Sequence, residues 1–212
     1  MRLQEFLNEK IRSVEEIKET IERDCSFYLY YLRKGKNFYK RDLPRLPKAR
    51  LEERKVRKDR KPADTPVEFH NALDNFLYKK FGWYPRSQGL FVWASNNLIG
   101  AQMPILPIGK FSVVFHKDIT DIYTKIAMFI QHSYGYDIDE LPNSITRDEK
   151  RRWAQEFIEE HKPALNNYTD SIIRSLRMPN TREIMINCDK YYILNTGSSQ
   201  MMELWDEIRQ VS

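Results

Sequence analysis

The stretch from residue 83 to residue 116 is the most apolar part of this polar chain, and it constrains the fold more than any other feature. It holds two runs rich in β-branched and aromatic residues, Gly89–Ala94 and Ile105–Phe115. Such side chains favour strands, because they pack well on a pleated surface. Gly109-Lys110 predicts a turn or bulge within the second run. The sequence therefore predicts a central sheet on which the other elements pack.

Helical patterns lie on both sides of this stretch. Apolar residues at three- and four-residue spacing predict helices with one buried face over residues 3–24, 66–81, 118–134, 146–160, 164–176 and 198–210. Cys25–Leu32 is an aromatic run that fits either a buried strand or a helix, and we favour the helix. Glu183–Leu194 predicts a strand pair or one bulged strand. These patterns together indicate an α+β protein.

The clearest local signal marks the helix that begins near residue 66. Thr65 is a good N-cap, Pro66 fits the first helical position, and Glu68 stands where a capping-box carboxylate reaches back. Gly82 predicts the end of this helix, because glycine readily adopts the left-handed conformation of a C-cap.

Length and composition predict one domain. The chain has 212 residues, of which 41% are hydrophobic, and this is enough for a real core. We expect a single domain over residues 1–212, with an N-terminal helical region (1–32), a basic extended segment (33–63) and an α+β body (64–212).

The absence of a membrane helix and of a disulfide framework indicates the cellular compartment that we expect for the protein. No run approaches the roughly 20 apolar residues of a membrane helix, so we expect no membrane partner. Cys25 and Cys188 stand alone and far apart, which predicts no disulfide framework. The expected compartment is therefore reducing and intracellular, and the inside of a phage-infected cell would satisfy this equally.

The charge is concentrated in one segment. Arg33–Lys61 carries fourteen Lys or Arg and four Asp or Glu, a net charge of +10 in a chain whose total is +5. Asn37–Ala63 is rich in proline and predicts an extended, exposed connection with one strand at Leu51–Val56. Three interpretations stay open: a solvated loop, a nucleic-acid contact in which Phe38 and Tyr39 stack on bases, or contact with a phosphorylated cofactor or a partner.

Standard catalytic signatures are absent from the sequence. There is no HExxH, paired CxxC, GxSxG or GxGxxG motif, and the four histidines have no metal-ligand spacing. His70 and Asp74 lie one helical turn apart. This pair either orients a catalytic imidazole or is a structural histidine with its partner. Taken alone, the residues predict only an α+β protein with a basic segment.

Four segments carry a family resemblance that reaches further: CSFYLYYLRKGKNF, VRKDRKPADTPVEFHNALDNFLYKKFGWYPRSQGLF, ILPIGKFSVVF and EIMINCDKYYIL. From about Cys25 to Leu194 the chain resembles a group of tailed-phage proteins that are similar to the ADP-ribosyltransferase fold. The resemblance implies an α+β fold with a split central antiparallel or mixed sheet and N-terminal, middle and C-terminal helices. In that fold NAD lies in a cleft between two small sheets.

The resemblance also implies three kinds of site residue. A glutamate on a late strand positions the ribose of NAD, and Glu183, just before Ile184-Met185-Ile186, matches it. The same carboxylate could instead be a sheet-edge residue without a catalytic role. An arginine on the first strand holds the cofactor phosphates. Arg33 or Lys34 stands at that position, although lysine lacks the two-pronged donor geometry of arginine.

Two further residues complete the expected NAD site. The hydroxyl patch on the second strand falls at residues 91–95, where Ser95 is the hydroxyl candidate. Trp93 occupies a position where relatives have a small polar residue. Arg86, just before this strand, is the arginine that could replace the role of Lys34.

Two functions of different classes follow from the sequence. The first is NAD-dependent ADP-ribosyl transfer to a host or phage macromolecule, for which a protein is one candidate acceptor. The second is a catalytically inert, virion-associated or structural phage protein, whose basic residues 33–61 contact DNA or phage structural proteins. The expected location is the host cytoplasm or the phage virion.

Overall fold

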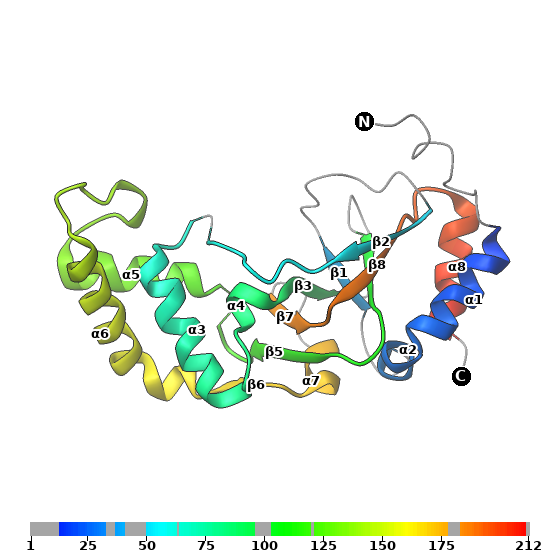
Figure 1. Ribbon diagram of the computed structural model, residues 1–212, viewed down its shortest axis with the longest axis horizontal. Helices are drawn as coiled ribbons and strands as arrows, with labels where there is room; N and C mark the ends of the chain where they lie inside the picture. Colours follow the sequence, from blue (N-terminus) through cyan, green and yellow to red (C-terminus); the bar gives the residue numbers. More distant parts are fainter. Residues whose placement is uncertain are drawn as a thin grey trace.

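The computed structural model describes residues 13–32, 37–40, 50–62, 64–95, 103–119, 121–177 and 183–210. Within these ranges the protein is α+β, with helices at both ends of a central sheet (Figure 1). The α-helices are α1 (Val14–Asp24), α2 (Ser26–Leu32), α3 (Val67–Phe81), α4 (Pro85–Gln88), α5 (Ile122–Tyr134), α6 (Arg147–Leu165), α7 (Ile172–Leu176) and α8 (Ser199–Gln210). The strands are β1 (Asn37–Lys40), β2 (Leu51–Lys55), β3 (Leu90–Ser95), β4 (Met103–Pro107), β5 (Ser112–His116), β6 (Tyr168–Thr169), β7 (Glu183–Asn187) and β8 (Lys190–Leu194).

The eight described strands form one sheet in the order β2-β8-β4-β1-β3-β7-β5-β6, and every pair is antiparallel. For Glu183–Leu194 we expected a strand pair or one bulged strand. The segment does form two strands, but β7 and β8 do not pair with each other. β7 lies between β3 and β5, whereas β8 lies between β4 and β2. Because β4, β1 and β3 lie between β8 and β7, the half of the sheet with β8 and the half with β7 are joined through β1, the first strand among the described residues.

The predicted turn at Gly109 separates β4 from β5. Gly109 has a φ of 70°, a left-handed conformation that glycine adopts without a steric penalty. Its backbone N–H donates to the carbonyl oxygen of Asp24 at 2.8 Å, which ties the turn to the end of α1. The single run predicted over Ile105–Phe115 is therefore two strands, and each belongs to a different half of the sheet.

Alternate residues of the central strands point into two separate cores. Val92 and Ile184 belong to a core with α1, α2, α7 and α8, whereas Phe91 and Met185 belong to a core with α3, α5 and α6. Figure 1 shows the sheet in the middle, with α3, α5 and α6 at one end and α1, α2 and α8 at the other. The period-two alternation of strands thus buries both faces of β3 and β7.

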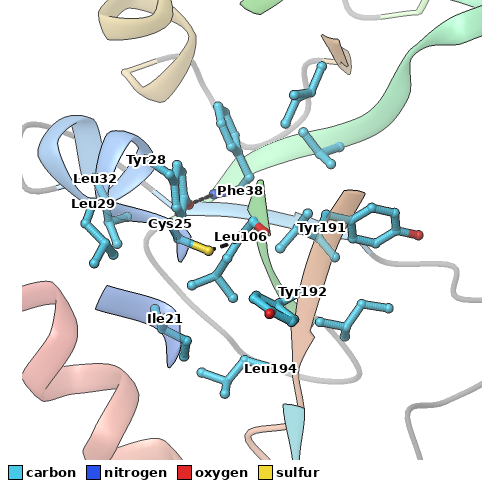
Figure 2. Packing of buried hydrophobic residues seen from close by; sticks show 14 of the residues in the cluster. Ile21, Cys25, Tyr28, Leu29, Leu32, Phe38, Leu106, Tyr191, Tyr192 and Leu194 are labelled. Carbon is cyan, nitrogen blue, oxygen red and sulfur yellow. Dashed lines mark hydrogen bonds between the residues drawn. The ribbon is translucent and has the colours of Figure 1, made fainter. Parts of the chain in front are cut away.

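The core beneath α1 and α2 includes the aromatic run predicted as a helix, and α2 confirms that prediction. Figure 2 shows Tyr28 stacked beside Phe38, with its hydroxyl accepting a hydrogen bond from the Phe38 N–H at 2.8 Å. Cys25 lies in the same core, with its sulfur 3.8 Å from the carbonyl oxygen of Leu106. Cys25 and Cys188 are both free thiols, as expected.

The basic segment is less exposed than predicted. The strand at Leu51–Lys55 agrees with expectation, but Asn37–Lys40 also forms a strand, β1, in the middle of the sheet. Phe38 is fully buried and Tyr39 is only 5% exposed, so neither ring is available on the surface to stack on bases. The expected stacking of Phe38 and Tyr39 on bases is therefore wrong. The sequence did not indicate β1, because a four-residue strand between cations shows no periodic pattern.

Helix boundaries follow local signals in part. α3 ends at Phe81 with Gly82 as its C-cap, as predicted. At its start, however, Pro66 is the N-cap and no side chain caps the helix, so the predicted roles of Thr65 and Glu68 are wrong. Glu68 instead forms an ion pair with Arg147 at 3.5 Å.

Three other helix predictions concern the final helix, the segment 164–176 and the N-terminal segment. The final helix agrees with α8, whereas the expected helix over 164–176 contains β6 and the short α7. The N-terminal pattern over 3–24 forms a helix from Val14, and residues 3–12 lie outside the described residues. No helix in the described ranges has the length and apolar character needed to cross a bilayer.

Candidate functional site

Two of the predicted site residues meet in the structure. Arg86 Nη1 lies 3.4 Å from Glu183 Oε1, although the two residues are 97 positions apart in the sequence. Arg86 belongs to α4, which leads directly into β3, and Glu183 is the first residue of β7. Because β3 and β7 are paired neighbours, the sheet brings the two side chains together.

The short helix α4 is fixed to α3 by one buried carboxylate. Asp74 accepts hydrogen bonds from the backbone N–H groups of Arg86 at 2.7 Å and Ser87 at 2.9 Å. His70 Nε2 lies 3.0 Å from the hydroxyl oxygen of Ser87. The predicted pair of His70 and Asp74 therefore holds the backbone that carries Arg86, which agrees with the structural interpretation of this histidine.

A glycine completes the connection from α4 to β3. The N–H of Gly89 donates to the carbonyl oxygen of Pro85 at 3.0 Å. A Cβ atom at position 89 would lie 2.3 Å from that oxygen. Only glycine permits this close approach, so Gly89 fixes the direction in which Arg86 enters the site.

Arg86 and Glu183 line a cavity of about 520 Å³. Its walls come from four parts of the chain: the segment between β2 and α3, α4 with its neighbour His70, the strands β3 and β7, and the start of α5. The lining residues are Arg60, Pro62, Asp64, Thr65, His70, Arg86, Phe91, Trp93, Asp121, Tyr123 and Glu183. The cavity thus combines both signs of charge with three aromatic rings.

Burial and neighbouring charges shift the titration of two groups in this cavity. Burial raises the pKa of Glu183 above its usual value, although the nearby Arg86 and Arg60 favour its charged form. Burial, together with the positive charges of Arg86 and Arg60, lowers the pKa of His70 to about 4 despite the opposing charge of Asp74. His70 is therefore neutral at pH 7, and its buried Nδ1 has no hydrogen-bond partner among the described residues.

Trp93 is a wall of the same cavity. It lies opposite Glu183 in the pairing of β3 with β7, and the centre of its ring lies 6.3 Å from the centre of the Tyr39 ring on β1. The side chain is half-buried. Trp93 and the candidate site residue Glu183 therefore occupy paired positions of neighbouring strands.

The other predicted site residues are placed only in part. Ser95 is the last residue of β3, and its backbone lies opposite Asn37 of β1. Arg33 and Lys34 lie outside the described residues. The structure therefore brings Arg86 and Glu183 together and fixes the strand that ends at Ser95.

Sequence reasoning missed Arg60 as an individual site residue. It is one of the fourteen cations between Arg33 and Lys61, and nothing in the sequence sets it apart from the others. In the structure its guanidinium carbon lies 3.7 Å from the centre of the Phe91 ring, inside the lining of the cavity. Only the fold makes this distinction.

A larger cavity, of about 980 Å³, lies between α3 and α6. Its charged lining residues are mostly solvated or paired, as in the ion pair of Lys162 with Glu159 at 3.3 Å. The smaller cavity is the better candidate site, because buried groups with shifted pKa values converge there.

Comparisons with protein-family models, curated proteins and solved structures find no match to this chain. Among the described residues, no group of His, Cys, Asp and Glu side chains is arranged to hold a metal ion. The residues that line the cavity are therefore what indicates its chemistry.

Proposed function

We propose that the cavity around Arg86 and Glu183 binds NAD and that the protein transfers ADP-ribose to a host or phage macromolecule. The observation that carries this proposal is the contact between Arg86 and Glu183 at 3.4 Å within one cavity. A cation for the cofactor phosphates and a carboxylate for the ribose are the two groups that such a reaction needs most.

The cavity suits a ligand of this kind in size and charge. Its volume of about 520 Å³ falls within the roughly 300–1,000 Å³ of small-molecule sites. NAD carries a negative diphosphate and a positive nicotinamide ring, and the cavity offers Arg60 and Arg86 beside Asp121 and Glu183. The buried Nε of Arg86 has no partner among the described residues and is free to donate to a bound phosphate.

Bound NAD would supply an ADP-ribosyl group. The bond between the ribose and the nicotinamide nitrogen would break, and the electron pair would leave with nicotinamide. A nucleophile of the acceptor would form the new bond to the ribose and release a proton. Glu183 would stabilise the positive charge that develops on the ribose, because a preorganised carboxylate in a water-poor site interacts strongly with such charge. Arg86 would hold the phosphates with its planar pair of donors.

The arrangement of the strands also supports the proposal. The resemblance implies an arginine on a first strand, a hydroxyl on a second strand and a glutamate on a later one. β1 begins at Asn37, shortly after Lys34, β3 ends at Ser95, and β7 begins at Glu183. These three strands are neighbours in the order β1-β3-β7, so the strands that carry Ser95 and Glu183 lie side by side in the sheet. Arg33 and Lys34 lie outside the described residues.

The test is turnover of labelled NAD by the purified protein with a host lysate, following label transfer and nicotinamide release. We expect Glu183→Gln to lower the rate roughly 10²–10³-fold, as loss of one electrostatic stabiliser does. Glu203→Gln, at an exposed position on α8, is the control that keeps wild-type activity. A folded wild type that neither binds NAD nor releases nicotinamide would contradict the proposal and favour the inert virion-associated protein.

A further inference from the structure

Arg60 is an exposed lining residue of the candidate NAD cavity, on the segment that links β2 to α3. Its backbone N–H donates to the carbonyl oxygen of Ser87 at 3.0 Å, next to Arg86 in α4. Its guanidinium lies over Phe91 with 3.7 Å between its central carbon and the ring centre. This contact fixes the position of a side chain that is otherwise exposed.

Arg86 approaches the same ring from the interior of the site. Its guanidinium carbon lies 5.7 Å from the centre of the Phe91 ring. Arg86 is 7% exposed, and its only ion pair within the described residues is the one with Glu183. Two guanidinium groups thus lie around one aromatic ring, one from a buried and one from an exposed residue.

The two arginines share Glu183 as a charged neighbour. Arg60 forms no ion pair among the described residues, but the charges of Glu183 and Asp64 favour its charged form. Glu183 also pairs with Arg86. Partial burial and the neighbouring Arg86 lower the pKa of Arg60. Like charges held close together repel each other, and an anionic group between them relieves this repulsion. Because Asp64, Asp121 and Glu183 also line the cavity, an anionic group is favoured where it lies between the two guanidinium groups.

We infer that Arg60 is a second phosphate-binding residue, and that Arg60 and Arg86 together hold two linked phosphates. The ligand class is a diphosphate-bridged nucleotide, and a nucleoside monophosphate would engage only one guanidinium. Each guanidinium presents a planar pair of donors that matches phosphate oxygens. This inference rests on the proposed NAD site and names its main selectivity, which is for the diphosphate.

The test is calorimetric binding of ADP-ribose, ADP and AMP to the wild type and to Arg60→Gln. We expect the substitution to weaken ADP-ribose and ADP binding about 10- to 100-fold, the value of charge-assisted hydrogen bonds, and to change AMP binding less than about threefold. Arg60→Lys keeps the charge without the paired donors and should be intermediate. Arg57→Gln is the matched control, because Arg57 is exposed and pairs with Asp59 in the same segment.

The outcomes separate this inference from the proposed function. Equal ADP-ribose affinity of wild type and Arg60→Gln overturns the inference, even if the wild type consumes NAD. Equal weakening of AMP and ADP-ribose also overturns it, because selectivity for the diphosphate would be absent. Loss of ADP-ribose binding in Arg60→Gln, in a protein that does not release nicotinamide, supports the diphosphate site and rejects the transferase.

Discussion

Asp74→Asn is the substitution that tests most directly how the site is held. The carboxylate of Asp74 is 4% exposed and accepts the backbone N–H groups of Arg86 and Ser87 at 2.7 and 2.9 Å. An amide keeps one acceptor oxygen but turns an NH₂ group towards the second N–H, which then has no partner. A hydrogen bond to a charged acceptor contributes about 1.5–3 kcal/mol, and we expect a loss of that size in the free energy of unfolding.

Urea denaturation followed by circular dichroism measures this loss, and the melting temperature should fall by about 3–12 °C in a chain of this length. Asp148→Asn is the matched control, because Asp148 is 87% exposed and pairs with Arg151 at 2.9 Å. Exposed pairs of this kind contribute up to about 1 kcal/mol and often less. A loss in Asp74→Asn no larger than in the control would refute the argument that Asp74 anchors α4.

Two further predictions concern the same region. Gly89→Ala places a Cβ atom 2.3 Å from the carbonyl oxygen of Pro85, and we expect about 1–3 kcal/mol of destabilisation in urea denaturation; unchanged stability would show that the turn relaxes. For His70, burial lowers the pKa from 6.5 to about 4. The unfolded chain therefore binds this proton more tightly than the folded protein does. The contribution of His70 to the free energy of unfolding is fully present above about pH 6.5, and the free energy of unfolding falls by about 2–3 kcal/mol towards pH 4.5. His70→Gln should remove that pH dependence, and identical slopes in the two proteins would count against it.

Much of the fold was predictable because many of its elements are specified locally. The end of α3 follows from a buried stripe that stops at a glycine, and Gly82 does adopt the left-handed C-cap. The helix expected over 146–160 begins at a capping box, in which Thr146 and Glu149 bond each other's backbone N–H groups. These signals lie within a few residues of the structures they determine, so one sequence is sufficient to find them.

The failures concern elements that depend on distant partners. β1 has only four residues, and its place in the sheet comes from pairing with β3 and β4, more than fifty positions away. The expected helix over 164–176 gives way to β6, whose Tyr168 pairs with His116 of β5. In such short segments, tertiary pairing decides between conformations that local propensity leaves close in energy.

The candidate site shows the same division. Glu183 and Arg86 were both candidate site residues from the sequence, but the sequence did not indicate their contact, which depends on the pairing of β3 with β7. Arg60 could not be chosen from fourteen clustered cations, because its distinguishing feature is its packing on Phe91. A charge run states that cations are present, whereas only the fold states which of them share a cavity.

The position of Arg86 therefore depends on three restraints from different parts of the chain. Asp74 holds the backbone of α4, Gly89 sets the turn into β3, and the pairing of β3 with β7 brings Glu183 within 3.4 Å. Asp74 and Gly89 are not among the residues that line the cavity. A loss of stability in Asp74→Asn should then be accompanied by weaker ADP-ribose binding, whereas an equal loss caused by a core substitution far from α4 should leave the affinity of the folded protein unchanged. This comparison separates a site that is positioned for a ligand from an ion pair that only stabilises the fold.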